Sequence, residues 1–71
     1  MRKSKHLPII AKNIKKYRAK LGISQDKLSK LADITFHTIT KIESGATSSP
    51  GIETVMKIAK ALDVTVNDLL E

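Results

Sequence analysis

Apolar residues recur at helical spacing in five separate segments of the chain. In the first, about residues 8 to 21, Ile10, Ile14, Tyr17 and Leu21 fall on one face. The inner residues expected in the other segments are Leu28, Leu31 and Ala32; Ile39 and Ile42; Ile52, Val55, Met56, Ala59 and Leu62; and Val66, Leu69 and Leu70. No segment shows the alternating pattern of a strand. The pattern predicts an all-α fold with five helices.

The residues at the ends of these segments are of the types that start and stop helices. Ser24 and Thr35 are suited to cap the second and third helices, and Thr65 with Asp68 forms a capping box before the last. Gly22 stands where the first helix would end in a left-handed residue. We therefore expect the third helix to cover about residues 36 to 44.

A very short turn joins the second and third helices. Asp33 is one of the few residue types besides Gly that tolerate a left-handed backbone, and Ile34 would fill the corner behind it. Because both helices share an inner face, the outer face of the third would project from the domain. The pattern predicts a bihelical unit with one exposed helix face.

The chain is short and has no cysteine, so we expect one small domain with neither a disulfide framework nor a thiolate metal site. Its apolar runs fall far short of the ~20 residues that span a bilayer, and no signal peptide follows Met1. We expect a cytoplasmic protein without a membrane partner. Residues 1–7 would form a basic N-terminal arm and residues 8–71 the folded domain.

Positive charge is concentrated in the first half of the chain. Residues 1–30 carry ten bases and one acid, whereas residues 31–71 carry three bases and six acids. A basic half of this kind attracts a polyanion, with nucleic acid the first expectation and an anionic membrane surface the second. A basic face that serves only solubility is the simpler alternative.

Catalytic and metal-binding patterns are weak. His6 lies in the expected arm and His37 on an exposed helix, and neither has the spacing of a catalytic triad. Two distant histidines without cysteine form no recognisable metal-ligand set. We therefore expect no enzyme activity, no metal and no cofactor.

Several stretches of the sequence resemble the Cro and lambda-repressor-like helix-turn-helix proteins, the XRE family. The stretches are "LGISQDKLSKLADIT", "TITKIESG" and "PGIETVMKIAKALDVTVNDLL", and the resemblance extends over residues 10 to 70. It implies a compact five-helix, lambda-repressor-like domain whose second and third helices form the helix-turn-helix. It also implies that helix 36–44 enters the DNA major groove.

The resemblance assigns roles to individual residues. Gln25 would touch a phosphate and brace the recognition helix, and Arg18 would form a salt bridge with Glu43. The positions that match the family's contacts to bases or to the nearby backbone are Thr35, Phe36, His37, Thr38 and Lys41. Each role has an alternative: a merely solvated Gln25, phosphate binding by Arg18, packing of Phe36 on its own domain, and a contact from Lys41 to phosphate rather than to a base.

Two positions depart from the family pattern. Asp33 occupies a turn position where the family often has Gly, and the loop residues 46–49 lack the Lys or Arg that several relatives direct at the DNA backbone. The first adds backbone strain, and the second leaves phosphate contacts there to hydroxyl and main-chain N–H groups. We therefore expect modest affinity from one isolated domain.

The resulting functional hypothesis is a sequence-specific regulator of transcription, a repressor, that binds double-stranded DNA as a homodimer. The dimer would use the face of the last two helices, with Ile58, Val64, Val66, Leu69 and Leu70 as the interface residues. The alternative is an antitoxin or anti-repressor whose main partner is a protein such as a toxin.

Overall fold

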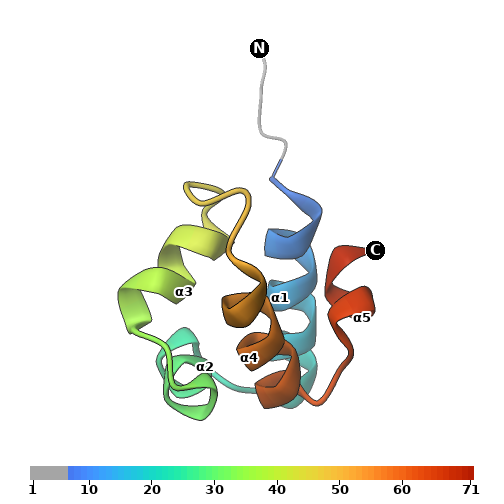
Figure 1. The fold of residues 1–71 in the computed structure, drawn as a ribbon. Helices are drawn as coiled ribbons and strands as arrows, with labels where there is room; N and C mark the ends of the chain where they lie inside the picture. The colour runs from blue at the N-terminus through green and yellow to red at the C-terminus, as the bar shows by residue number, and fades with distance from the viewer. Residues whose placement is uncertain (1–6) are drawn as a thin grey trace.

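The computed structural model describes residues 7–71, and every regular element in that range is an α-helix (Figure 1). The helices are α1 (Ile9–Leu21), α2 (Gln25–Ala32), α3 (Phe36–Glu43), α4 (Ile52–Leu62) and α5 (Val66–Leu70). The all-α, five-helix prediction is confirmed, and α3 ends one residue earlier than expected. Most of the predicted basic arm, residues 1–6, lies outside the described residues.

The N-terminal caps have the predicted hydrogen bonds. The Ser24 hydroxyl accepts from the Lys27 N–H at 3.0 Å, and the Thr35 hydroxyl accepts from the Thr38 N–H at 3.2 Å. Before α5, the Thr65 side chain accepts from the Asp68 N–H while the Asp68 carboxylate accepts from the Thr65 N–H. Each cap satisfies a backbone donor that the helix itself leaves without a partner.

Three helices end in the same left-handed turn. The turn residues are Gly22, Asp33 and Asp63, with φ of 69°, 58° and 60°. In each turn the next residue donates its N–H to a carbonyl five positions earlier, as Ile34 does to Ser29 at 2.9 Å. The left-handed conformation predicted for Asp33 is therefore confirmed, and Ile34 packs against the core behind it.

Eleven apolar side chains from all five helices form one core. They are Ile10, Ile14, Leu28, Ala32, Ile39, Ile42, Val55, Ile58, Ala59, Leu62 and Leu69. A buried polar residue, Asn13, joins α1 to the end of α5, because its amide donates to the Leu69 carbonyl at 2.8 Å. In Figure 1, α2 and α3 lie on one side of α1 and α4, and α5 lies on the other.

Several residues expected in the inner stripes are exposed instead. Leu31 is 52% exposed, and on α4 Ile52 and Met56 are 61% and 55% exposed. The buried stripe of α4 includes Val55 and Ile58. The buried face is therefore rotated about the helix axis relative to the face predicted from the sequence. The apolar arc of α4 is wider than the face that its neighbours cover, and packing decides which edge stays in solvent.

The predicted dimer face is wrong for two of its five residues, which are buried. Ile58 and Leu69 are fully buried in the core, and Val64 and Val66 pack against it, whereas Leu70 is exposed. Ile58 and Leu69 cannot reach a partner while the domain is folded. Only Leu70 remains from the original set as a large exposed side chain.

Candidate nucleic-acid interface

The outer face of α3 carries three of the predicted contact residues. His37 and Lys41 are one helical turn apart and exposed, and Thr38 lies beside them, partly exposed. The only acid on α3 is Glu43, and it is turned inward and 1% exposed. The exposed surface of α3 therefore presents hydrogen-bond donors and a cation without a carboxylate.

Thr35 and Thr38 are coupled at the start of α3. Their hydroxyl oxygens lie 2.9 Å apart, so one donates to the other, in addition to the cap bond from the Thr38 N–H. A hydroxyl group both donates and accepts, which leaves this pair able to bond an outside group while it holds the first turn. The structure brings together these two predicted site residues.

Phe36 is half exposed, at 49%, at the first position of α3. By helical periodicity it lies on the flank of α3 shared with Thr40 and Glu43, away from the line of His37 and Lys41. The Thr40 hydroxyl donates to the His37 carbonyl, so it is already used within the helix. Phe36 thus borders the outer face and leaves an apolar surface uncovered.

Arg18, Glu43 and Gln25 fix α3 against the rest of the domain. Arg18 donates through Nε and Nη2 to the two Glu43 carboxylate oxygens at 2.8 and 2.9 Å, which confirms the predicted salt bridge. Its Nη1 donates to the Ile23 carbonyl at 3.0 Å. Gln25 Nε2 donates to Glu43 Oε1 at 2.9 Å. These bonds join α1, the α1–α2 turn, α2 and α3, so α3 is held in one orientation.

The Arg18 guanidinium is charged throughout the ordinary pH range. Hydrogen bonding to Glu43 raises the pKa of Arg18 above its usual value, partly opposed by burial and assisted by the charge of Glu43. The ion pair is bidentate, which restricts its geometry more than a single contact does. It supplies structural support rather than a free cation for a ligand.

The beginning of α2 lies beside this network, because Gln25 is its first residue, and it is the second part of the candidate interface. The first N–H groups of α2 point out of the helix, where they and the helix dipole favour an anion. Gln25 begins the helix, with its amide nitrogen held by Glu43. Lys27, in the same turn, is also exposed. It was not among the site residues predicted from the sequence, although its position in the first turn of α2 beside Gln25 could have identified it.

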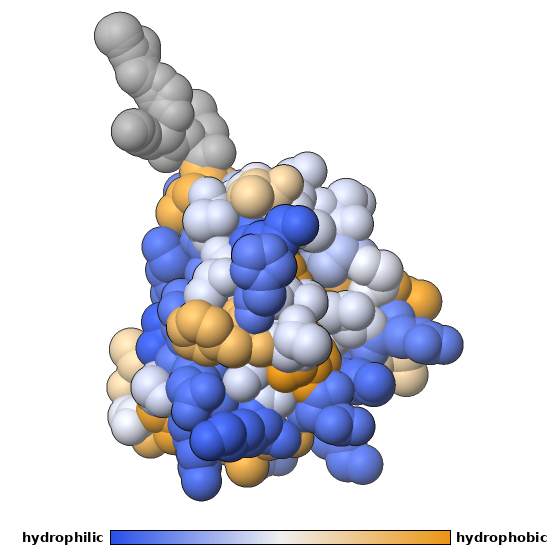
Figure 2. Space-filling model, turned by 90° about the vertical axis from the view of Figure 1, so that its left-hand side faces the viewer, coloured by the Kyte–Doolittle hydropathy of each residue, from blue (hydrophilic) through white to orange (hydrophobic). Residues whose placement is uncertain are grey.

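Charges around the two helices are mostly positive. Lys30 pairs with Asp26, the acid of the first turn of α2, at 3.2 Å, and both side chains are well exposed. On α1, Lys12, Lys15, Lys16 and Lys20 are exposed, and α1 contains no acid. Figure 2 shows the side of the molecule formed by α2 and α3, where pale and apolar side chains are bordered below by hydrophilic ones.

Other kinds of site find less support in the described part of the chain. Among residues 7–71, no three His, Asp or Glu side chains lie close enough together to hold a metal ion. No helix in the same range has the length and apolar character needed to cross a membrane. The clearest arrangement of exposed polar groups is the outer face of α3 with the start of α2.

The sequence is similar to a helix-turn-helix family model and to known regulators of transcription. The helix-turn-helix family model matches residues 14–69. The HTH-type transcriptional regulator SinR of Bacillus subtilis (strain 168) is 32% identical over 63 residues, which are 89% of this chain and 57% of SinR. SinR of Bacillus licheniformis is 32% identical over 62 residues, or 87% and 56% of the two chains. The chain thus spans a little over half the length of these relatives.

Solved structures have the same arrangement of helices. The N-terminal DNA-binding domain of SinR from Bacillus subtilis superposes with a TM-score of 0.86 at 32% identity, covering 89% of this chain and 91% of that one. The restriction-modification controller protein C.AhdI from Aeromonas hydrophila gives 0.81 at 23% identity, with 86% and 91% covered, and supports the fold alone. With the family match over most of its length, the chain belongs to the XRE-type helix-turn-helix family and has the lambda-repressor-like fold.

Proposed function

We propose that the protein is a sequence-specific regulator of transcription that binds double-stranded DNA by inserting α3 into the major groove. One observation carries the proposal: the only acid of α3, Glu43, is buried against Arg18, and the exposed face of α3 carries hydroxyls, His37 and Lys41. The Arg18 cation offsets the charge of the Glu43 carboxylate, which therefore repels phosphate less than a free acid does, whereas the exposed groups would donate to base edges and to the backbone.

Affinity that does not depend on sequence comes from the basic side chains. The N–H groups at the start of α2, Lys27 and the hydroxyls of the loop after α3 would contact phosphates on either side of the groove. Residues 1–7 would add a basic arm to residues 8–71, the binding domain. Gln25 would then act twice, through its amide nitrogen on Glu43 and its amide oxygen toward the backbone or solvent.

The relatives bear on the kind of regulator. The SinR proteins are described as HTH-type transcriptional regulators, and the solved SinR domain as a DNA-binding domain. By transfer, we assign this chain a regulatory and non-catalytic role, in the cytoplasm with the chromosome, and repression as its effect. A helix that fills the major groove without a further contact to polymerase blocks a promoter, which is why repression is the simplest outcome.

A homodimer would supply the sequence information that one helix lacks. One α3 spans only a few base pairs, and two related by a two-fold axis double both the site and the contacts. The exposed apolar side chains Ile52, Met56 and Leu70 are the revised candidate interface, because Ile52 and Leu70 line one small hollow and Met56 follows one turn later on α4. The two α3 helices would then sit about 34 Å apart on the DNA.

The proposal is tested by selecting bound fragments from the source genome and measuring affinity for the selected site at several salt concentrations. We expect a preferred, near-palindromic site and a slope of log K against log salt of about −0.9 for each phosphate contacted. Deleting residues 1–6 should make this slope shallower and leave the preference for the site unchanged. No preference for any fragment would contradict the proposal, and an unchanged slope would show that the arm does not touch DNA.

Light scattering at tens of micromolar protein tests the dimer separately. Ile52→Asp and Leu70→Asp should yield monomers, whereas Leu31→Asp, which changes an equally exposed leucine elsewhere, should not. A wild-type monomer that binds the full site without cooperativity would rule out the dimer. The antitoxin or anti-repressor alternative predicts instead that a protein partner binds much more tightly than any selected DNA.

A further inference from the structure

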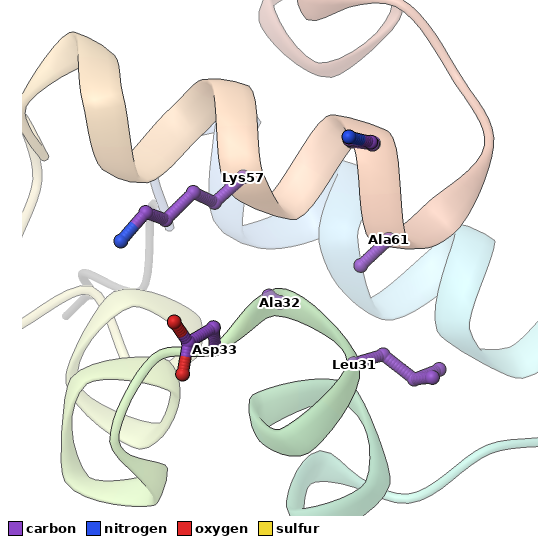
Figure 3. A pocket seen from close by; sticks show the side chains of 6 residues that line it. Leu31, Ala32, Asp33, Lys57 and Ala61 are labelled. Carbon is purple, nitrogen blue, oxygen red and sulfur yellow. The ribbon is translucent and has the colours of Figure 1, made fainter.

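A groove lies between the end of α2 and the second half of α4, in a part of the molecule that the proposed DNA contacts do not use. Its volume is about 460 Å³, and its lining residues are Leu31, Ala32, Asp33, Lys57, Lys60 and Ala61 (Figure 3). Met56 lies one helical turn before Lys60 and borders the groove, but none of the candidate dimer residues Ile52, Met56 and Leu70 lines it. The groove is therefore a separate surface.

The floor of the groove is apolar. Ala32 belongs to the core, Ala61 packs against it, and the small size of both side chains leaves room above them. Leu31 extends from the end of α2 beside this floor and is half exposed. A large apolar side chain from another molecule would cover Leu31 and Ala61 together, and removal of this surface from water would favour binding.

Two unpaired cations form the α4 edge of the groove. Lys57 and Lys60 are three residues apart and exposed, and neither joins an ion pair within residues 7–71, where the salt bridges are Arg18–Glu43 and Lys30–Asp26. Asp33 lies across the groove from α4, with its carboxylate on the same side as the Lys57 ammonium (Figure 3). The α4 edge of the groove is thus positive. The carboxylate of Asp33, on the opposite edge, would repel an acidic group of a bound molecule that came close to it.

The groove stays open when α3 is bound to DNA in the proposed manner. The phosphate-binding end of α2 is its N-terminus at Gln25, whereas the groove begins at Leu31, near the other end of a helix that is about 12 Å long. The outer face of α3 is formed by His37, Thr38 and Lys41, none of which lines the groove. A second molecule would therefore bind without displacing DNA.

From these contacts we infer that the groove is a docking site for an acidic segment of a partner protein that carries a large apolar side chain. The apolar side chain packs on Leu31 and Ala61. A carboxylate next to it pairs with Lys60, at the end of the groove away from Asp33 and the Lys57 ammonium. Asp33 repels an acid at its own end and so fixes the direction of the segment. This inference goes beyond the proposed function, since it concerns a protein partner and not the operator.

Duplex DNA is the competing occupant of a positive surface, and the groove suits it less well. DNA presents phosphates at every step along both strands, so its backbone would bring negative charge toward Asp33 as well as toward the lysines. It also has no large apolar group to cover Leu31. A peptide can place its acids on one side of an apolar residue, as this groove requires.

The test is an NMR titration of the isotope-labelled chain, without DNA, with a synthetic helical peptide of about 15 residues that bears leucines one turn apart flanked by glutamates. A peptide of the same composition in scrambled order is the control. We expect saturable shifts of the Leu31, Ala32 and Ala61 signals with the first peptide, at a Kd of about 1 mM or lower, and weaker, dispersed shifts with the second.

Charge-matched variants distinguish binding of the peptide in the groove from general attraction of an acidic peptide to a basic protein. The Lys57→Glu/Lys60→Glu variant and Leu31→Ser should each weaken binding about tenfold, whereas Lys12→Glu/Lys15→Glu, with the same spacing on α1, should leave it nearly unchanged. An undisturbed spectrum of each free variant verifies folding. Equal losses in both double variants, equal binding of the scrambled peptide, or no saturable shift would overturn the inference.

Two further outcomes would also overturn it. If Lys57→Glu/Lys60→Glu changes the oligomeric state, the occupant is a second copy of this chain. If a short duplex shifts the groove signals and displaces the peptide, the occupant is DNA. Because the titration contains no DNA unless it is added for this purpose, failure of the peptide leaves the proposed regulator function untouched.

Discussion

Arg18 and Glu43, 25 residues apart in the sequence, form a bidentate ion pair with nitrogen to oxygen distances of 2.8 and 2.9 Å. The two partners differ in environment, since the Glu43 side chain is 1% exposed and the Arg18 side chain 21%. Gln25 adds a third donor to Glu43. The pair fixes α3 on α1, so its loss would affect both stability and the orientation of α3.

The unequal burial predicts unequal losses on mutation. Arg18→Ala leaves a buried carboxylate without its cation and should lower the free energy of unfolding by about 3–5 kcal/mol. Glu43→Gln leaves Arg18 with access to water and should cost about 1–2 kcal/mol. Urea denaturation followed by circular dichroism measures both. Equal losses, or a larger loss for Glu43→Gln, would show that burial does not govern the pair.

The left-handed turn at Asp33 stores a small strain that substitution should reveal. Asp33→Gly relieves the contact between Cβ and the backbone and should raise the free energy of unfolding by about 0.5 kcal/mol, while Asp33→Val should lower it by about 1–2 kcal/mol. Asp63, with φ of 60°, offers a second test of the same effect at the end of α4. The same rank order of Gly, Asp and Val at both positions in thermal denaturation is the expected result.

Lys41 distinguishes reading of bases from contact with the backbone. If its ammonium binds a base edge, Lys41→Ala should weaken binding to the selected operator by about 1–3 kcal/mol and relax the preference at one or two base pairs. The matched control is Lys60→Ala, which removes an exposed lysine from another helix, α4. A loss that is equal on all DNA would make Lys41 a phosphate contact and assign specificity to Thr38 and His37.

Asp68 should make the stability of α5 depend on pH. Hydrogen bonds from the Thr65 N–H and hydroxyl, with some attraction from Lys16, hold the pKa of Asp68 below its usual value. The ionised form is therefore favoured in the folded state. Its contribution is complete above the unfolded pKa of about 3.9 and is lost as the pH falls through the lower folded pKa.

Thermal denaturation of wild type and Asp68→Ala over a pH series measures this contribution. The variant should melt below wild type at pH 7, and the difference should shrink once the pH falls below about 3.9. A difference in melting temperature that is constant across the series would mean that Asp68 acts through packing rather than through its charge.

Local chemistry allowed the helix ends to be predicted closely. The caps at Ser24, Thr35 and Thr65 depend on a side chain and an N–H only three residues away, and the left-handed turn at Asp33 depends on the residue's own backbone preference. Such contacts form within one turn of chain and need no partner from elsewhere. The Arg18–Glu43 bridge was different, since only the resemblance to a known family indicated it.

By itself, the sequence determined the five helices, their limits to within about one residue, and the turn between α2 and α3. Tertiary structure alone decided that Ile58 is buried while Ile52, Met56 and Leu31 are exposed, and that Gln25 bonds to Glu43. The physical reason is that the spacing of apolar residues determines the width of the apolar face of a helix, but not which part of that face a neighbouring helix covers. That choice depends on how all five helices pack together, and it leaves the groove beside Leu31 open.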